Sequence, residues 1–286
     1  MPRPYKLAIL SDIHGNLTAF EAVLADLKKY SPIDGIIVAG DIIGGPGQEE
    51  ILQRLREMNA VMIQGNWDHR IVTIDDGTAP GHFYTASQHL LIRWLHAHLS
   101  SEAMQFLHTL PEQRTFHPDG ADPIRIVHGS PRHIAEKVYP QSEDQLNEVL
   151  SLVLEPVVIF GHTHVQWQVS RHGRLALNPG ALFNSHNCPG AQYALLCWGG
   201  SAWSVFPMMV PYDKEKVREA FQATGFLSVG PLPKLFLYVM NTGNSVEQSF
   251  IKYAKEKAEE AGYNHWPYIP DEIWDSIKIE DFLSGS

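Results

Sequence analysis

The sequence predicts an α/β fold in which two β-sheets pack on each other with helices outside. Residues 6–160 alternate between short apolar runs and longer segments whose apolar side chains recur at helical spacing. Beyond residue 165 the pattern changes to short strands separated by turn signals such as His172-Gly173 and Gly199-Gly200. The chain of 286 residues is 44% hydrophobic and 19% charged, which allows a sizeable core and argues against disorder.

Each element follows from its local pattern. Five short apolar runs are expected to be buried strands, at residues 6–11, 35–39, 60–64, 124–127 and 157–160. Segments with one apolar face are expected to be helices, at residues 17–30, 48–58, 85–99, 102–109 and 143–153. Four further strands are expected at residues 165–170, 174–178, 193–198 and 202–207. We expect these last four strands to form an antiparallel sheet.

The chain divides by pattern near residue 211. No linker, repeat or low-complexity tract interrupts residues 1–211, so we expect one domain there. Residues 212–286 read as helices, clearest at 245–261, and we expect a C-terminal helical extension packed on that domain. The extension could cover the active site or form a contact in a homo-oligomer, and composition does not choose between these roles.

Composition limits the partners and the compartment. The net charge of −10 argues against a stable nucleic-acid partner and against anionic membranes. No run approaches the roughly 18 apolar residues that a membrane span needs. Cys188 and Cys197 are too few for a disulfide framework, so we interpret them as free thiols in a reducing compartment. The first apolar run is too short for a signal peptide and ends at Asp12. These features together predict a cytoplasmic protein.

A polar cluster directly follows each of the five strands expected in the first half. The clusters are Asp12-Ile13-His14, Gly40-Asp41, Gly65-Asn66, His128-Gly129 and Gly161-His162-Thr163-His164. In an open α/β sheet the carboxyl ends of the strands share one edge, and ligands bind there. Two aspartates, one asparagine and four histidines would then converge. Such a set of oxygen and imidazole ligands suits a pair of divalent transition metals better than one ion.

Each cluster taken alone has an ordinary structural explanation. Asp and Asn are common at caps and turns, and a single histidine such as His128 could be a core residue. The combination, in this order and always after a strand, favours metal binding. Asp12 and His14 are two apart and point the same way on an extended chain. Asp41 could bridge two ions through its two oxygens, and His162 and His164 could bind one ion each.

The series D-x-H, GD, GN, H-G and GHTH resembles the calcineurin-like metallophosphoesterase superfamily, over about residues 6–208. The segments SDIHGN, VHGSP and NPGA are most similar to its small bacterial and archaeal phosphoesterase branch. The resemblance implies a four-layer αββα sandwich of two mixed sheets flanked by helices. It implies one ion on Asp12, His14, Asp41 and His164, and another on Asn66, His128 and His162, with Asp41 bridging. Metals in the family include Mn, Fe, Zn, Ni and Co, so the identity is not predicted. It also implies in-line attack on phosphorus by a metal-bridging hydroxide, without a covalent intermediate.

One departure from the family concerns the general acid. Many members have a histidine directly after the asparagine, whereas this chain has Trp67. His69 is a candidate to replace that histidine as the general acid. The candidate catalytic residues are therefore Asp41, Asn66, His128 and His69. A weak general acid disfavours esters with poor leaving groups. Asn66, Trp67 and Arg132 are the candidate substrate-binding residues, and Trp67 could stack a base or an aryl group.

The sequence therefore predicts a dinuclear-metal-dependent phosphoester hydrolase that acts on a small molecule, with phosphodiesters favoured. A phosphomonoesterase or a nucleotide pyrophosphatase acting on a small metabolite is the alternative within the enzymes. A non-catalytic scaffold that uses its metal face to bind a partner is the alternative outside them. The loop after Gly40-Asp41 lacks the Arg-Gly of protein phosphatases, which argues against that role.

Overall fold

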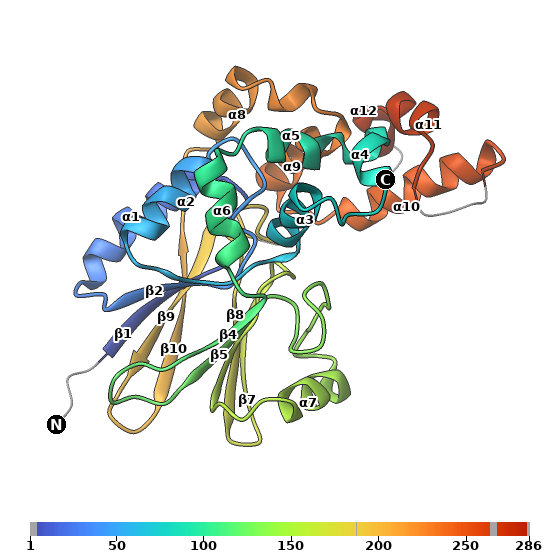
Figure 1. Ribbon diagram of the computed structural model, residues 1–286. Coiled ribbons are helices and arrows are strands. Elements are labelled where there is room, and N and C mark those ends of the chain that lie inside the picture. Colours follow the sequence, from blue (N-terminus) through green and yellow to red (C-terminus); the bar gives the residue numbers. More distant parts are fainter. Residues whose placement is uncertain (1–4, 187, 264–267, 285–286) are drawn as a thin grey trace.

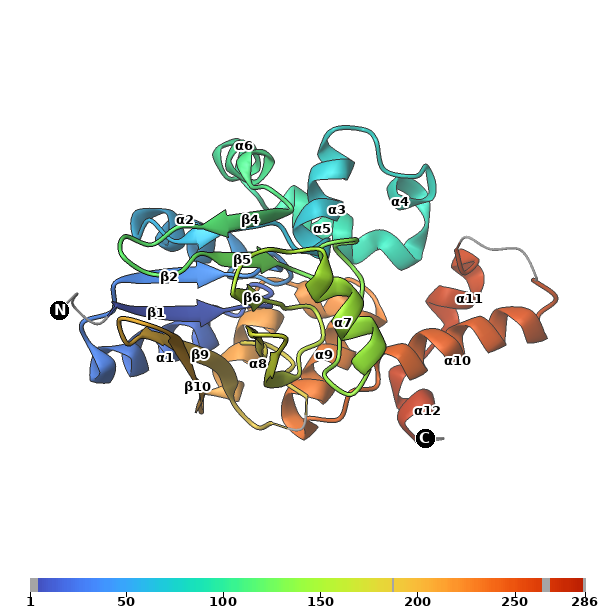
Figure 2. The ribbon, with the colours of Figure 1, turned by 90° about the horizontal axis from the view of Figure 1, so that it is seen from below.

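The computed structural model describes residues 5–186, 188–263 and 268–284. Two five-stranded sheets pack face to face, and helices cover both outer faces (Figures 1 and 2). This arrangement confirms the predicted four-layer αββα sandwich with C-terminal helices.

The first sheet has the order β10-β9-β1-β2-β3. Its strands are β1 (Tyr5–Leu10), β2 (Gly35–Val38), β3 (Val61–Met62), β9 (Ala191–Trp198) and β10 (Trp203–Val210). The first three are parallel, whereas β9 is antiparallel to β1 and β10 is antiparallel to β9. Leu7 and Ile9 face the second sheet, while Ala8 and Leu10 face the helices. Burial on both faces explains why residues 7–10 of β1 are all apolar.

The second sheet has the order β4-β5-β6-β8-β7. Its strands are β4 (Gln113–Phe116), β5 (Ile124–Val127), β6 (Val157–Ile159), β7 (Gln166–Arg171) and β8 (Arg174–Pro179). The three central strands are parallel, and the two edge strands are antiparallel to their neighbours. Ile126 and Ile159 point toward the first sheet and form the inner core, whereas Leu146 and Val149 of α7 (Glu143–Ser151) cover the outer face.

The prediction of one antiparallel sheet from the four later strands is wrong. The hairpin of β7 and β8 joins the second sheet, where β8 lies parallel to β6. Strands β9 and β10 return to the first sheet beside β1. The five clusters therefore follow strands of two facing sheets and not of a single sheet. Apolar alternation reports which face of a strand is buried, but it carries no information about which strand lies next to it.

Helices cover the outer face of the first sheet and extend beyond its carboxyl edge. They are α1 (Leu17–Leu27), η1 (Lys28–Tyr30), α2 (Gln48–Glu57), α3 (Asn66–Asp75), α4 (His82–Thr85), η2 (Ser87–His89), α5 (Leu90–Ala97) and α6 (Ser101–Thr109). The single helix expected at residues 85–99 is thus broken before α5. Helix α3 and strand β4 were not expected, because their sequences are polar and short.

The chain after β10 is helical. It forms α8 (Lys214–Ala223), η3 (Phe226–Ser228), α9 (Pro231–Thr242), α10 (Glu247–Glu260), α11 (Asp271–Ser276) and α12 (Ile279–Ser284). Val217 and Phe221 of α8 join the core outside the first sheet. Phe250, Trp274 and Phe282 belong to a separate small core among the last helices. Helix α11 meets η2 through hydrogen bonds from Ser87 to Asp271 and Asp275. The division at residue 211 stays a prediction.

None of the helices in the described ranges is both long and apolar enough to cross a bilayer. Cys188 and Cys197 are both free thiols.

Candidate metal centre

The structure brings all the predicted metal ligands together at one end of the sandwich. Asp12, His14 and His164 form one group whose ligand atoms lie within 4.8 Å of one another. A second group of the same compactness contains Asp41, His128 and His162. Asn66 adjoins the second group, because its Oδ1 lies 3.2 Å from Nε2 of His128. Loops that follow β1 and β2 of one sheet and β5 and β6 of the other supply the aspartates and histidines, and Asn66 is the first residue of α3, after β3.

Asp41 lies between the two groups. Its Oδ2 atom is 3.5 Å from Nε2 of His14 and 3.3 Å from Nε2 of His128. His14 belongs to the first group and His128 to the second. Asp41 is therefore placed to serve both groups with one carboxylate.

Backbone carbonyls orient three of the imidazole rings. The Nδ1 atom of His14 lies 3.3 Å from the oxygen of Ile43, and that of His128 lies 2.7 Å from the oxygen of Ala39. The Nδ1 atom of His164 is 3.1 Å from the oxygen of Asn184. A ring held in this way through Nδ1–H turns its Nε2 toward the candidate site, where this nitrogen can bind a metal once it has lost its proton.

The donor set fits divalent transition metals. Oδ1 of Asp12 is buried without a hydrogen bond of good geometry, although it lies 3.2 Å from Nε2 of His164. The Nε2 atoms of His14 and His164 face each other at 3.2 Å. A buried carboxylate oxygen and imidazole nitrogens that converge on one point are the ligands that such ions prefer.

Most of the candidate ligands have strained backbones. Positive φ angles occur at Asp12 (52°), His14 (46°), Asp41 (53°), His162 (67°) and His164 (56°). Each left-handed residue of this kind costs about 1–2 kcal/mol relative to an ordinary conformation. Such strain concentrates at functional sites, where the surrounding structure holds it.

The glycines before the ligands are required by close packing. A Cβ atom on Gly40 would lie 2.6 Å from the backbone nitrogen of Gly65. A Cβ on Gly65 would lie 2.1 Å from Oδ1 of Asp41, and one on Gly161 would lie 2.2 Å from Oγ of Ser11. Real Cβ atoms do not approach so closely, so any side chain at these positions would push the ligand loops apart.

Asp68 holds two ligand loops together. Its carboxylate accepts hydrogen bonds from the amides of Ile42 (3.1 Å), Ile43 (2.9 Å) and Gly65 (2.9 Å). It thus caps α3 and fixes the chain after Asp41. All three of these partners are backbone amides, so the hydrogen bonds assign Asp68 a capping role. Burial and the charge of Asp41 raise the pKa of Asp68 to about 7.

The centre concentrates negative charge in a buried place. Burial alone would raise the pKa values of Asp12 and Asp41, but the surrounding imidazoles lower both. Burial alone would lower the pKa of His128, yet the carboxylates of Asp41 and Asp12 raise it to about 10. Two buried carboxylates in contact with neutralising groups are typical of a site that binds cations.

A cavity of about 300 Å³ opens above the ligands. Besides several of them, it is lined by Trp67, Arg70, Lys137, His186 and the C-terminal residues Leu232, Phe236, Glu247 and Ile251. Arg70 makes no side-chain ion pair or hydrogen bond within the ranges that the structure describes. The sequence prediction missed Arg70 and Lys137. Because α3 begins at Asn66, recognition of that helix would have placed Arg70 one turn later on the same face.

Of the other predicted site residues, Trp67 lines the cavity at the metal centre, whereas His69 and Arg132 do not. The ring of Trp67 meets that of His14 edge-on, with centroids 5.7 Å apart, and lines the cavity. His69 is turned toward Gln64, 3.3 Å from its Oε1, and is not among the lining residues. Arg132 is paired with Glu136 and Glu148 and does not line the cavity either. The cationic side chains that do line it are Arg70 and Lys137.

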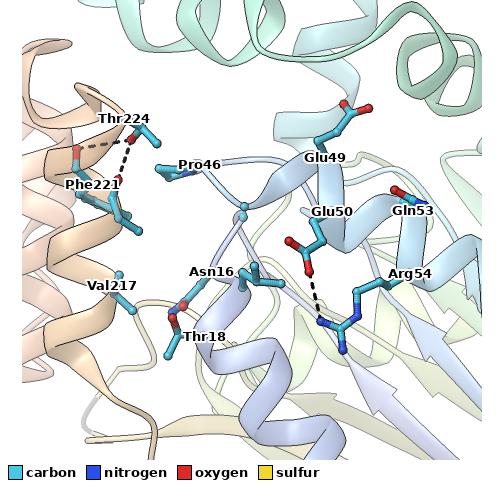
Figure 3. A pocket seen from close by; sticks show the side chains of 14 residues that line it. Asn16, Thr18, Pro46, Glu49, Glu50, Gln53, Arg54, Val217, Phe221 and Thr224 are labelled. Atoms are coloured by element: carbon cyan, nitrogen blue, oxygen red, sulfur yellow. Dashed lines mark hydrogen bonds and ion pairs between the residues drawn. The ribbon is translucent and has the colours of Figure 1, made fainter.

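A larger cavity lies elsewhere. It has a volume of about 680 Å³ and lies between α1, α2 and α8 (Figure 3). Its lining includes Glu49, Glu50, Arg54 and Thr224 but none of the candidate ligands. Size alone therefore does not identify the reactive site.

Comparisons with known proteins agree with the geometry. Residues 5–198 match the family model of the calcineurin-like phosphoesterase superfamily domain. The protein MJ0912 of Methanocaldococcus jannaschii is 29% identical over 180 residues, which are 62% of this chain and 70% of that protein.

Two solved structures share the fold. The crystal structure of a metallophosphoesterase from Sphaerobacter thermophilus has a TM-score of 0.67 at 26% identity, and the match covers 84% of this chain and 99% of that one. The hypothetical protein PH1004 from Pyrococcus horikoshii OT3 has a TM-score of 0.64 at 19% identity with the same coverage. The family match spans all the candidate ligands. This chain is a member of the calcineurin-like phosphoesterase superfamily and a metal-dependent phosphoester hydrolase.

Proposed function

We propose that this enzyme cleaves phosphodiesters of small molecules with the help of two divalent metal ions. The observation that carries the proposal is the position of Asp41, whose Oδ2 lies between Nε2 of His14 and Nε2 of His128. One group would hold an ion through Asp12, His14 and His164, and the other through Asn66, His128 and His162, with Asp41 shared. When bound, two such ions supply a water activated near neutral pH for in-line attack and offset charge on the phosphoryl oxygens.

The protein's own side chains would bind and orient the phosphoester. Arg70 and Lys137 bring positive charge to the cavity wall, where an anionic substrate would sit. The hydrogen bonds from the Nδ1 atoms of His14, His128 and His164 would keep the ligand rings from turning. Preorganisation of this kind removes a reorganisation cost at the moment of reaction.

Two observations support diesters over monoesters. Trp67 stands where many relatives have histidine, and His69 is turned toward Gln64, so neither offers the leaving group a proton. Esters whose leaving group departs without protonation should then react best. In addition, Leu232, Phe236 and Ile251 give the cavity an apolar wall that could receive a second ester arm. A monoester has no such arm.

A phosphomonoesterase is the second candidate. His186 also lines the cavity, with its ring 5.5 Å from that of His164. A histidine in that place could protonate a poor leaving group, which would extend the activity to alkyl monoesters.

The test compares bis-(p-nitrophenyl) phosphate with p-nitrophenyl phosphate on manganese-loaded protein. We expect about two metal ions per chain and a higher kcat/KM for the diester. Asp41→Asn should lose metal and at least about a hundredfold in kcat, because the shared carboxylate charge is gone. Asp119→Asn, the same change at an exposed position, should match the wild type. Preference for the monoester would favour the second candidate, and full metal loading without turnover of either ester would favour the scaffold.

The cytoplasmic location, the absence of a stable nucleic-acid partner and the possible homo-oligomer stay predictions from the sequence.

A further inference from the structure

We propose that helices α3 to α5 and the C-terminal helices form a second subsite beside the metal centre, which binds the nucleobase of a nucleotide phosphoester. The inference rests on the proposed function and names its substrate class. It also gives the C-terminal helices a role in substrate recognition.

The first observation is a second cavity that adjoins the first. It has a volume of about 250 Å³ and shares Trp67, Arg70, Leu232 and Ile251 with the cavity at the metal centre. The two volumes of about 300 and 250 Å³ together lie within the range of roughly 300–1,000 Å³ that small-molecule sites have. A substrate with a phosphate in one cavity and a ring system in the other would contact all four shared residues.

The second observation is the aromatic character of the lining. Phe83 and His89 are stacked, with ring centroids 4.0 Å apart and planes at 11°, and Trp67 and Trp274 also line the cavity. Flat aromatic rings around a narrow cavity favour a flat ligand, because stacked or edge-on ring contacts add to the area that is buried.

The third observation separates a nucleobase from a plain hydrocarbon ring. Gln88, His89 and Lys255 place polar groups among the aromatic ones. The side-chain oxygen Oε1 of Gln88 accepts a hydrogen bond from the backbone amide of Ile269 (2.8 Å). The side-chain nitrogen Nε2 of Gln88 lies 2.9 Å from Nε2 of His89. Burial and the nearby His82 lower the pKa of His89 to about 4, so this imidazole is neutral at pH 7. If Nε2 of His89 accepts from Gln88, the Nδ1–H remains as a donor for a base edge.

Arg70 links the two cavities. It lies on the shared wall, and no carboxylate among the described residues pairs with it at ion-pair distance, although the charge of Asp41 acts on it. A guanidinium stays charged and binds phosphate oxygens in a forked geometry. Along the wall, the metal ligands come first, then Arg70, then the aromatic cavity. A nucleotide would fit this order with its phosphate at the metal ligands and Arg70 and its base in the aromatic cavity.

The subsite is held by contacts between segments that are distant in sequence. The amide of Ser87 donates to Oδ1 of Asp271 (2.7 Å), and its hydroxyl donates to Oδ2 of Asp275 (3.0 Å). Together with the bond between Ile269 and Gln88, these contacts tie α11 to η2 at the far side of the cavity. The C-terminal helices thus complete the cavity wall and are fixed there.

The experiment measures binding by isothermal titration calorimetry on manganese-loaded full-length protein. The probes are adenosine 5′-monophosphate, ribose 5-phosphate and inorganic phosphate. We expect the adenosine nucleotide to bind about tenfold or more tightly than ribose 5-phosphate, since stacking and base contacts are available only to the nucleotide. Equal affinities for the two organic phosphates would overturn the proposal.

Two variants test the location. Phe83→Leu removes one aromatic face and keeps apolar volume, and Lys255→Trp fills the cavity from an exposed position. In both, the nucleotide preference should fall to about threefold or less while phosphate affinity is kept. Phe106→Leu, on α6 and outside both cavities, is the matched control and should keep the preference. A preference that persists in both test variants would place the base elsewhere and overturn the assignment.

Parallel assays of bis-(p-nitrophenyl) phosphate separate the two proposals. Turnover of this diester without a nucleotide preference would refute the base subsite alone. A nucleotide preference without turnover of any ester would support the subsite and refute the proposed phosphodiesterase activity.

Discussion

The indole of Trp67 meets the ring of Phe236 edge-on, with centroids 6.2 Å apart. Trp67 also contacts His14, and Phe236 contacts Phe183 at 6.1 Å between centroids. A chain of aromatic rings therefore connects a candidate metal ligand with helix α9. Trp67, in the position where many relatives have histidine, thus provides a contact for the C-terminal helices.

Phe236→Ala should weaken substrate binding more than chemistry. Phe236 lines the cavity but carries no reactive group, so we expect KM for a nitrophenyl diester to rise about three- to tenfold with a smaller change in kcat. The loss of a half-buried aromatic ring should lower the free energy of unfolding by about 1–3 kcal/mol. Steady-state kinetics and urea denaturation measure the two effects. Phe236→Leu should recover most of the stability, and an unchanged KM in a folded Phe236→Ala protein would contradict the contact's role.

Asp68→Asn should destabilise the protein and the site together. The carboxylate accepts three backbone hydrogen bonds in a buried place, whereas an amide adds two donors that have no acceptor there. We expect a loss of about 1–3 kcal/mol in the free energy of unfolding. The loops that carry Asp41 and Asn66 should also loosen, so metal affinity should fall.

Chemical denaturation and metal titration of Asp68→Asn test this expectation. Asp119→Asn is the exposed control. If Asp68 only capped α3, stability would fall while metal affinity stayed at the wild-type value. That result would contradict its role in holding the loop after β2.

The ligand set could be predicted because each ligand directly follows a buried strand. Asp12, Asp41 and His128 stand at strand ends, and strand ends converge whichever strands are neighbours. The sheet partners of strands β7, β8, β9 and β10 could not be predicted. The alternation in Gln166–Arg171 reports which face is buried, and the nearly continuous burial of Ala191–Trp198 reports only that both faces are covered; neither pattern identifies a neighbouring strand. The predicted fold class was nevertheless correct, although the four later strands divide between the two sheets and do not form one sheet of their own.

The substrate side of the site was harder to predict for a different reason. Arg70 lies four residues after Asn66, but helix α3, which turns it toward the cavity, has a polar sequence without a clear apolar period; Lys137 lies outside every ligand motif. Arg132 stands near His128 in the sequence, but Glu136 and Glu148 neutralise it. Side-chain pairing of this kind depends on which segments meet in space, which local pattern does not record.

Arg70→Ala should lower kcat/KM by about tenfold to a hundredfold for an anionic ester, because a charge-assisted hydrogen bond to phosphate contributes about 1.5–3 kcal/mol. Arg70→Lys should recover only part of the loss, since lysine lacks the forked donor geometry. Arg56→Ala is the matched control, because Arg56 pairs with Glu102 on the surface away from the cavity. Steady-state kinetics on all three variants test the expectation, and equal loss in Arg70→Ala and Arg56→Ala would contradict a specific phosphate contact.

A hydrogen bond between Tyr193 and Asp26 should make the free energy of unfolding depend on pH in the acid range. The hydroxyl of Tyr193 donates to Oδ2 of Asp26 at 2.6 Å in a buried place and so joins β9 to α1. Burial alone would raise the pKa of Asp26, but hydrogen bonds from Lys29 and Tyr193 lower it below the ordinary 3.8. A carboxyl whose pKa is lowered by folding stabilises the protein above its unfolded-state pKa, and this contribution is lost as the pH falls.

Tyr193→Phe should therefore lower the free energy of unfolding by about 1–2 kcal/mol at pH 7, since it leaves the buried carboxylate one hydrogen bond short. The gap between wild type and variant should narrow as the pH falls below about 4, where Asp26 becomes protonated. Urea denaturation of both proteins without metal, at about pH 7, 5 and 3, measures the gap. The carboxylates of the metal centre titrate in both proteins, so their contribution cancels in the difference. A gap that stays constant or widens on acidification would show that the hydroxyl stabilises the fold independently of the charge on Asp26.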